Sequence, residues 1–402
     1  MPETKKQTRQ QTITPIAIIG AGKIGETIVD LLLDSGDYQV TLIDASAETL
    51  ARFSPHQNLK TIQQDVNDPI ALITTLAGHF AVLSSTPFFL TRTIAQSALN
   101  AGCHYLDLTE DVDSTNFVRG LAARATSAFI PQCGLAPGFI SIVTQDIAKG
   151  FDELDAVRMA VGALPLYPSN TLNYNLTWST EGVINEYCEP CVCIEDGEIT
   201  QAPALENLQH FSLDGIKYET FNTSGGIGSL AESLAGKVKS LSYQTIRYPG
   251  HRDIMKTLLV DLRLKDRRDL LKDVLETAIP ATLQDVVLIF VTVSGRKNGR
   301  LIQQTYANKV YGKTIRGIER SAIQVTTASS ICAVLDLLQD GKIPDHGFIM
   351  QENIGLNLFL NNRFGRVYAV EHGHSDCNPT ELNTQRPEGL PKNLPSGVGV
   401  RR

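Results

Sequence analysis

The sequence lacks three features, and each absence narrows the class of protein. No continuous apolar run reaches the roughly 18 residues needed to cross a membrane, so we expect no membrane partner. The net charge of −7 argues against nonspecific binding to nucleic acid. The seven cysteines are an odd number scattered over 402 residues, which is typical of reduced thiols in a cytoplasmic protein and not of a disulfide framework.

The two ends of the chain differ in composition from the rest. Residues 1–11 contain Lys5, Lys6 and Arg9 but no following apolar segment, so we expect no secretory signal. Residues 1–12 and the polar, Pro- and Gly-rich residues 376–402 are expected to be flexible. The rest has the composition of a globular protein, with 42% hydrophobic residues, and its length favours two domains.

The most informative stretch is a glycine-rich turn between an apolar strand and an amphipathic helix. Residues 16–19 form a short apolar run of the kind buried in parallel sheets, and apolar residues recur at helical spacing from Ile24 to Leu32. The glycines between them have G-x-G-x-x-G spacing, which lets a dinucleotide pyrophosphate approach the start of the helix. The predicted cofactor-binding residues here are Gly20, Gly22, Lys23, Ile24 and Gly25.

A second apolar strand ends in an acidic residue that bears on the choice of cofactor. Residues 40–43 are followed by Asp44, about 20 residues after the last glycine, where a carboxylate binds the adenosine ribose hydroxyls. The same carboxylate would repel a 2′-phosphate, and residues 45–47 bring no cation. We therefore predict NAD as cofactor, with NADP left open because Arg52 could reach the ribose.

Further βα units continue the pattern and predict an α/β, doubly wound parallel sheet, a Rossmann domain over residues 13–136. Strands are expected at 59–63, 80–83, 105–108 and 128–131, and an apolar helix near 326–338 is expected to return to this domain within residues 322–360. Ligands bind beyond the carboxyl ends of such strands. The further cofactor-binding candidates at these ends are Asp65, Val66, Ser84, Ser85, Thr86 and Pro87.

The pattern of residues 137–321 differs, with hairpin turns between short strands, and it predicts an α+β domain with a mainly antiparallel sheet. Asp196-Gly197 and Asn298-Gly299 are typical hairpin turns. Helices are expected at 229–241 and 254–278. Strands are expected at 157–164, 174–178, 191–199, 218–221, 286–293 and 301–310. Such a sheet leaves faces and edges that need cover.

Four motifs give the sequence a family resemblance. They are CGLAPG at 133–138, TWSTEGVINEY at 177–187, TSGG at 223–226 and RYPGH at 247–251. With the glycine-rich turn, they resemble the saccharopine dehydrogenase family, within it the branch of saccharopine reductases and lysine 6-dehydrogenases, from about Ile16 to Glu352. The resemblance implies a nicotinamide-dependent oxidoreductase that acts on a C–N bond of an amino acid, saccharopine or lysine at its side-chain carbon. It also implies a second domain that closes over the first and carries the dimer contact, so we expect a homodimer formed through residues of about 151–320.

Amine oxidation needs a group that accepts a proton and groups that hold the substrate carboxylates. The candidates for catalysis are Asp107, Cys133 and His251. The candidates for substrate binding are Thr109, Glu110, Pro137, Gly138 and Arg247. Structural roles stay open for several of them: the two acids as turn or cap residues, the cysteine as a small buried hydrophobe, and the histidine as a helix-start residue bonded to backbone.

Other interpretations also remain open. A regulatory protein could bind the nicotinamide cofactor without turnover. A related dehydrogenase acting on a C–O bond would be expected to carry a lysine after the fifth strand, where this sequence has Asp107-Leu108-Thr109-Glu110. The single C-x-x-C at Cys188–Cys191 has no second pair to complete the roughly four ligands of a zinc site, so no metal is predicted.

Overall fold

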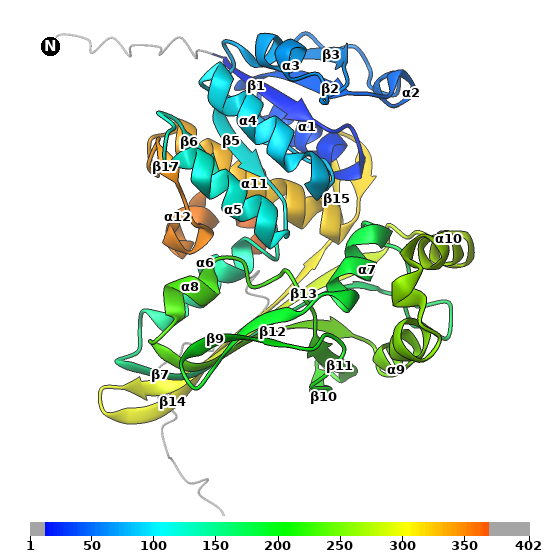
Figure 1. The fold of residues 1–402 in the computed structure, drawn as a ribbon, viewed down its shortest axis with the longest axis vertical. Coiled ribbons are helices and arrows are strands. Elements are labelled where there is room, and N and C mark those ends of the chain that lie inside the picture. Colours follow the sequence, from blue (N-terminus) through cyan, green and yellow to red (C-terminus); the bar gives the residue numbers. More distant parts are fainter. Residues whose placement is uncertain (1–12, 370–402) are drawn as a thin grey trace, which may run out of the picture. The chain divides into compact units, whose positions relative to one another are not determined.

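The computed structural model describes residues 13–369 of the chain, and the two ends that we expect to be flexible lie outside the described residues. Two sheets organise the described part (Figure 1). The first is built by the blue and cyan strands that start the chain, and the second by the green and yellow strands that follow.

The first sheet has seven parallel strands in the order β17-β6-β5-β4-β1-β2-β3, which confirms the predicted Rossmann domain. Six strands come from the predicted units, and the seventh comes from a distant part of the chain. Their bounds are β1 Thr14–Ile19, β2 Tyr38–Asp44, β3 Leu59–Gln63, β4 Ala81–Ser84, β5 His104–Asp107, β6 Ala128–Ile130 and β17 Gly347–Phe348.

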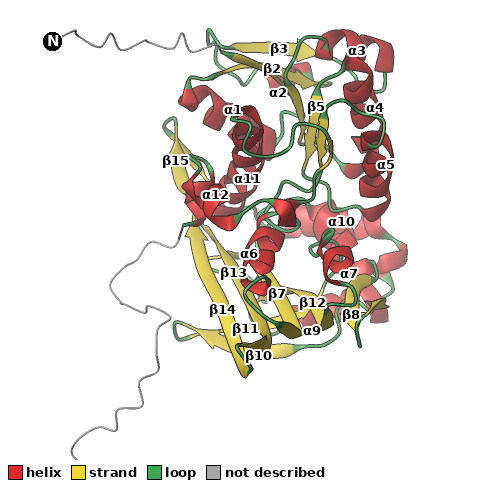
Figure 2. Ribbon diagram, turned by 90° about the vertical axis from the view of Figure 1, so that its left-hand side faces the viewer, coloured by secondary structure: helices red, strands yellow, loops and turns green. Residues whose placement is uncertain are grey.

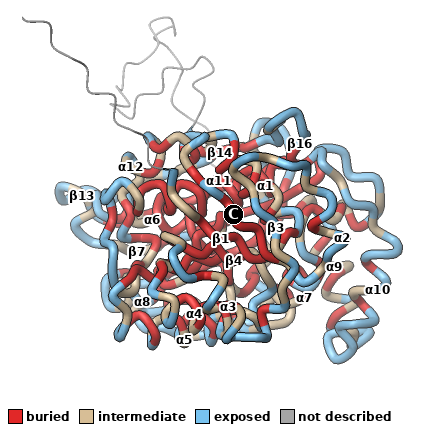
Figure 3. The backbone as a smooth tube through the Cα atoms, turned by 90° about the horizontal axis from the view of Figure 1, so that it is seen from above, coloured by how far each residue is buried: buried red, intermediate tan, exposed pale blue. Residues whose placement is uncertain are grey.

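Alternate residues of β1 explain why both faces of this sheet are covered. Ile16 and Ile18 pack in the same core as α1 and α11, whereas Ala17 and Ile19 pack with α3, α4 and α5. A strand buried on both faces has a continuous apolar sequence, as β1 does. Figure 3 shows β1 and β4 as buried segments surrounded by more exposed ones. The helices are α1 Lys23–Ser35, α2 Ala47–Leu50, α3 Pro69–Leu76, α4 Thr91–Ala101 and α5 Val112–Ala122, with a short 3-10 turn η1 Phe88–Leu90.

Helix α11, Ala322–Gln339, packs against α1 on the first sheet. It begins with a capping box in which Ser321 and Gln324 each satisfy the other's backbone N–H. By length and composition alone it resembles a membrane span, but 83% of it is buried inside the protein, as in the core helix of a globular domain. Serine, threonine and aspartate interrupt its apolar residues, so the helix is not one continuous apolar run.

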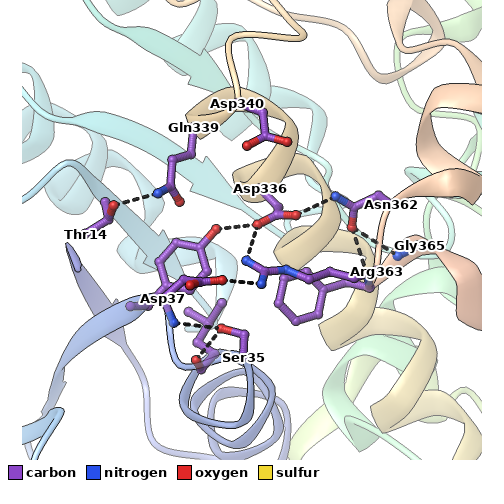
Figure 4. A network of polar contacts seen from close by, with 12 residues as sticks. Thr14, Ser35, Asp37, Asp336, Gln339, Asp340, Asn362, Arg363 and Gly365 are labelled. Carbon is purple, nitrogen blue, oxygen red and sulfur yellow. Dashed lines mark hydrogen bonds and ion pairs between the residues drawn. The ribbon is translucent and has the colours of Figure 1, made fainter. Parts of the chain in front are cut away.

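A buried polar network fixes the last described residues to the first domain (Figure 4). The Asp336 carboxylate accepts hydrogen bonds from the Tyr38 hydroxyl at 2.7 Å, Asn362 Nδ2 at 2.6 Å and Arg363 Nη2 at 2.6 Å. Arg363 also pairs with Asp37. Three segments far apart in sequence are therefore joined by charge-assisted bonds, which are stronger than neutral ones.

The second sheet is mixed and mainly antiparallel, as predicted, with its main path in the order β10-β11-β12-β7-β13-β14 and β8 and β9 beside β12. Only β12 and β7 pair in parallel within this sheet. The positive φ angles of Asp196 and Gly197 form the predicted hairpin turn between β8 and β9. The bounds are β7 Glu153–Pro165, β8 Cys191–Glu195, β9 Glu198–Ala202, β10 Gln209–Leu213, β11 Ile216–Asn222, β12 Val238–Arg247, β13 Asp285–Lys297 and β14 Arg300–Tyr311, with a separate hairpin of β15 Lys313–Ile315 and β16 Ile318–Arg320.

Helices flank this second sheet, and Figure 2 shows α6 beside β7 and β13. The bounds are α6 Phe139–Ala148, α7 Thr180–Cys188, α8 Leu230–Leu234, α9 His251–Lys256, α10 Arg268–Ala278 and α12 Leu356–Asn361. A π-helical turn η2 Thr257–Asp261 and 3-10 turns η3 Leu264–Asp266, η4 Gln351–Asn353 and η5 Gly365–Tyr368 complete the described elements.

Three sequence expectations in this domain are wrong. The helix expected over 229–241 ends at Leu234, and after Gly236, with φ of +69°, the chain becomes β12 because it is buried between β11 and β7. The helix expected over 254–278 is interrupted by the π-helical turn and by Arg263 at a φ of +58°. Residues 174–178 form a loop in which Leu176 makes one isolated bridge, to Ala281.

Candidate active site

The glycine-rich turn has the geometry of a dinucleotide-binding loop. Gly20 has a φ of +97°, and a Cβ on Gly25 would lie 1.8 Å from the Gly20 carbonyl oxygen, so the chain itself requires both glycines. Gly22 differs, because a Cβ there would meet no protein atom within 4 Å and its φ of −72° is ordinary. It lies immediately before α1, in the wall of a cavity. Its missing side chain therefore leaves room for a pyrophosphate at the free N–H groups of the helix, and the residues fit the cofactor.

Two polar side chains hold this loop in shape. The Asp44 carboxylate accepts hydrogen bonds from the Ala21 and Ser46 N–H groups, each at 2.8 Å. The Ser85 hydroxyl contacts the carbonyl oxygens of Ile19 at 3.1 Å and Gly20 at 2.9 Å. The acid at the end of β2 and the hydroxyl after β4 thus converge on the loop between them. The two side chains converge because β1 lies between β2 and β4 in the sheet.

Some of the remaining cofactor candidates line the cavity, and others lie outside its lining. Ser84 is buried and bonds the Thr86 hydroxyl at 3.0 Å. Asp65 is exposed and accepts the Asn67 N–H at 2.9 Å, closing a turn, while Val66 is buried in the core of the first domain. The cavity wall includes six of the cofactor candidates: Gly22, Lys23, Ile24, Ser85, Thr86 and Pro87.

A cavity of about 910 Å³ connects the glycine-rich turn to the second sheet. Its size suits a dinucleotide's reactive end together with a small substrate. From the first domain it also receives the predicted substrate-binding residues Thr109 and Glu110. From the second domain it receives the predicted Pro137 and Arg247, and a set that was not predicted to line the site: Thr177, Trp178, Asn185, Glu186, Tyr243 and Thr245.

Asp107 lies behind the cavity wall and joins the loops after β5 and β6. Its carboxylate accepts hydrogen bonds from the Tyr105 hydroxyl at 2.8 Å, the Thr109 N–H at 3.1 Å and the Gln132 N–H at 2.9 Å. Burial raises its pKa to about 6. Asp107 is not among the residues that line the cavity, so its placement supports a role in shaping the site more than direct contact with substrate.

Cys133 and Gly138 also shape the wall from behind. The Cys133 thiol is fully buried, donates to the Ile130 carbonyl at 3.0 Å and accepts from Gln351 Nε2 at 3.2 Å. Burial raises its pKa well above the usual value, so the thiol keeps its proton and has no free site to accept one from a substrate. Gly138 has a φ of +134°, and a Cβ there would lie 2.0 Å from the Gly134 carbonyl oxygen. The loop needs glycine for its own shape, and neither residue lines the cavity.

His251 is fully buried and positions Arg247 through Tyr187. Its Nδ1 lies 3.0 Å from the Leu172 carbonyl, which can only accept, so Nδ1 carries the proton and Nε2 accepts from the Tyr187 hydroxyl at 3.0 Å. Tyr187 in turn accepts from Arg247 Nε at 2.9 Å. Burial, with the Arg247 charge, lowers the pKa of His251 to about 3. The ring is therefore neutral at ordinary pH, has both nitrogens occupied and lies outside the cavity lining, which argues against proton exchange with a substrate.

Arg247 presents a buried positive charge to the cavity. Its side chain is 2% exposed, and among the described residues it forms no ion pair. Two of its five N–H donors are used, by Tyr187 and by the Ile246 carbonyl at 2.9 Å, and the guanidinium lies 5.3 Å from the centre of the Tyr174 ring. A desolvated guanidinium with unused donors is suited to bind a carboxylate in two-point fashion.

The sequence reasoning missed Glu186, although a signal was present. It stands inside the motif at 177–187, on the buried face of α7 beside Val183 and Tyr187. An acidic residue among apolar residues at helical spacing indicates a buried charge, which is rare without a function.

The seven-stranded parallel sheet and its glycine-rich loop define a protein with a Rossmann-type dinucleotide-binding fold. The chain belongs to the saccharopine dehydrogenase family: residues 16–131 match the model of the saccharopine dehydrogenase NADP-binding domain, and residues 134–361 match that of the saccharopine dehydrogenase C-terminal domain. The resemblance seen in the sequence motifs is confirmed.

Individual relatives are distant. The chain is 23% identical over 255 residues to saccharopine dehydrogenase (NADP⁺, L-glutamate-forming) of Pyricularia oryzae, covering 61% of this chain and 56% of that protein. It is 20% identical over 322 residues to mitochondrial alpha-aminoadipic semialdehyde synthase of Bos taurus, covering 74% of this chain and 33% of that protein. The chain thus spans only part of the length of these curated relatives.

Two solved structures share the fold. The apo saccharopine dehydrogenase (L-Glu forming) of Saccharomyces cerevisiae superimposes with a TM-score of 0.72 at 17% identity, covering 86% of this chain and 95% of that one. The homospermidine synthase of Legionella pneumophila, solved in complex with NAD, superimposes with a TM-score of 0.62 at 13% identity, covering 93% and 96%. At these identities the likeness establishes the fold alone.

Proposed function

We propose that this protein is an NAD(P)-dependent oxidoreductase that acts on a C–N bond of an amino acid, with saccharopine, or lysine at its side-chain carbon, as the substrate class. The observation that carries the proposal is the buried Arg247 guanidinium without an ion-pair partner among the described residues, in the same cavity as the glycine-rich loop. A substrate carboxylate would supply the missing charge. Family membership and the names of the relatives support the chemistry.

The chain's residues divide the work between the two ends of the cavity. Gly22 and the start of α1 would hold the cofactor pyrophosphate, and Ser85, Thr86 and Pro87 would lie along the nicotinamide half. The bound nicotinamide supplies hydride transfer at its C4 atom. Arg247 orients the amino acid from the opposite wall, and the apolar wall residues Leu108, Leu135 and Val161 exclude water from the space between.

The test is a spectrophotometric screen of saccharopine, lysine and related diamines against NAD and NADP, in both directions. The expected result is a change in nicotinamide absorbance with at least one carboxylate-bearing amine. Tight cofactor binding without turnover of any amine would favour the regulatory interpretation, and turnover of a polyol would favour the C–O dehydrogenase.

For the cofactor, we infer a preference for NAD. Asp44 keeps its carboxylate at the end of β2, next to the glycine-rich loop, and within α2 and its flanks Arg52 is the one cation, with its side chain on the Thr49 carbonyl. The family model and the fungal relative carry NADP in their names. Our inference of NAD for this chain therefore differs from the cofactor in those names. We expect NAD to bind at least about 10-fold more tightly than NADP, because a 2′-phosphate would face the carboxylate.

Asp44→Asn should reduce the ratio of the NADP dissociation constant to the NAD dissociation constant, since it removes the charge but keeps a hydrogen-bond acceptor. Fluorescence titration of both cofactors against both proteins measures it. Glu48→Gln in α2 is a matched control that changes the same charge nearby and should leave the ratio unchanged. Equal or tighter NADP binding by the unaltered protein would contradict the inference.

For assembly, we infer a homodimer formed through the second domain. Strand β14 is the edge of the second sheet, and Leu301 on it is 69% exposed and Tyr311 51% exposed. Apolar edge strands need cover to avoid uncontrolled pairing. Light scattering should give twice the chain mass at micromolar concentration, and a monomer mass would remove the claim.

A further inference from the structure

Glu186 is an exception among the buried acids of the described chain. Five others, Asp107, Glu219, Asp285, Asp336 and Glu352, each accept at least two hydrogen bonds through their carboxylates. Glu186 is 8% exposed, and no described residue donates a hydrogen bond to its carboxylate or forms an ion pair with it. A buried carboxylate without partners costs several kcal/mol unless something else satisfies it.

The fold holds Glu186 in place while leaving its carboxylate free. The residue lies in the second turn of α7, whose first turn is capped by Ser179. Its backbone carbonyl accepts the Ser224 N–H at 3.0 Å, which ties the helix to the Ser224–Gly226 turn. Gly225 in that turn packs on Glu110, since a Cβ there would lie 3.1 Å from the Glu110 Cβ. The scaffold therefore fixes the backbone of Glu186 by named contacts, and the side chain lines the cavity.

The charged and titratable groups around Glu186 come from several elements. Arg247 and Tyr243 face it from β12, Glu110 from the loop after β5, Tyr174 from the loop after β7, Tyr187 from α7 itself and Cys191 from β8. Burial raises the pKa of Glu186 to about 8, with Arg247 opposing the rise and Glu110 adding to it. In the free protein at neutral pH this carboxyl therefore holds a proton.

We propose that Glu186 is the group that exchanges a proton with the substrate amine, an inference that rests on the proposed function. In the oxidative direction an N–H bond of the substrate ammonium breaks and its proton moves to a Glu186 carboxylate oxygen. The lone pair left on nitrogen forms the C=N bond as the adjacent carbon loses its hydride to the nicotinamide. In the reductive direction Glu186 returns the proton to nitrogen. Arg247 in the same cavity holds the substrate carboxylate.

This role has a consequence that can be measured without turnover. An alkyl ammonium carries its proton below about pH 10. When it binds beside a protonated Glu186, one of the two protons must leave, because two such donors have no acceptor between them. The number of protons released is one, whether the remaining proton is on the substrate nitrogen or on a Glu186 oxygen. Substrate binding at pH 7 should therefore release close to one proton, and at about pH 9.5, where Glu186 is already ionised, release should fall towards zero.

The experiment compares the unaltered protein with Glu186→Gln, using the amine that the unaltered protein oxidises. Calorimetry with reduced cofactor present, in two buffers of different ionisation enthalpy, counts the protons released on binding. We expect close to one proton from the unaltered protein and none from the variant. Turnover by the variant should fall by about 10²–10⁴-fold, with cofactor binding unchanged. Glu189→Gln, at the exposed end of the same helix, is the control and should match the unaltered protein.

The outcomes separate the two proposals. Undiminished turnover and proton release in Glu186→Gln would overturn the role of Glu186 and leave the proposed function standing. Failure of the unaltered protein to bind or oxidise any amine would overturn the proposed function and this inference with it. Should Glu186→Gln not fold, Glu186→Asp keeps the carboxylate and must retain proton release with a shifted pH profile, or the inference is wrong.

Discussion

Arg247→Met is expected to raise KM for a carboxylate-bearing amine by at least about 100-fold, with a smaller change in kcat. A two-point bond from a buried guanidinium to a carboxylate contributes about 3 kcal/mol or more, and each 1.4 kcal/mol is tenfold in binding. The bond forms in the ground state and the transition state alike, so its loss appears chiefly in KM. Steady-state kinetics with saturating cofactor measure the effect.

The same substitution should leave the melting temperature unchanged or raise it. Arg247 carries a charge at 2% exposure with no ion pair among the described residues, and removing an uncompensated buried charge relieves a desolvation cost. Methionine has similar volume and fills irregular space. Opposite signs for binding and stability are typical of a group retained for a ligand. A fall of several degrees with an unchanged KM would show instead that Arg247 serves the fold.

His251→Asn tests the positioning chain behind Arg247. His251 reaches the guanidinium only through the Tyr187 hydroxyl. We expect KM to rise by roughly threefold to tenfold, because Arg247 loses part of its orientation, less than for Arg247→Met. The pH profile of kcat should stay unchanged, since the His251 pKa of about 3 lies below any assay range. If the variant instead loses the fall in kcat on one side of the pH profile, His251 is the proton acceptor.

The first domain could be predicted from the sequence because its signals are local. Short apolar runs, the glycine spacing and helix ends each occupy a few consecutive residues, and they gave the strands from β1 to β6 in order. The seventh strand, β17, could not be found this way. It has two residues, Gly347 and Phe348, and owes its conformation to pairing with β6 more than 200 residues earlier in the chain.

The second domain shows how tertiary contacts override local pattern. The helix expected over 229–241 overlaps residues 238–247, which form a strand buried between two others. The candidate site was predicted unevenly for the same reason. Motifs and strand ends identified Glu110 and Arg247, which line the cavity, but also Asp107, Cys133 and His251, which do not line it. Spacing in sequence does not tell a wall residue from its support, because that difference depends on which way a side chain points.

Gly25→Ala is expected to weaken cofactor binding by more than about 100-fold and to lower the free energy of unfolding by about 1–3 kcal/mol. Helix propensity alone predicts the opposite sign, because alanine stabilises a helix interior by about 1 kcal/mol over glycine. The structure decides between them. A Cβ at this position would lie 1.8 Å from the Gly20 carbonyl oxygen and 2.8 Å from the Ser85 hydroxyl, and a backbone carbonyl cannot rotate away as a side chain can.

Helix α1 must therefore move away from β1 in Gly25→Ala, and its N–H groups move with it from the place where they would meet the pyrophosphate. Gly22→Ala is the matched variant, since its Cβ meets no protein atom within 4 Å. This variant should keep its melting temperature. Its cofactor affinity should fall only because the added methyl group would clash with the bound pyrophosphate. Calorimetric unfolding and fluorescence titration of both variants separate the two effects. Normal cofactor binding by Gly22→Ala would show that the pyrophosphate does not lie at this loop, and greater stability of Gly25→Ala would show that α1 and β1 are not packed as closely as the glycine requires.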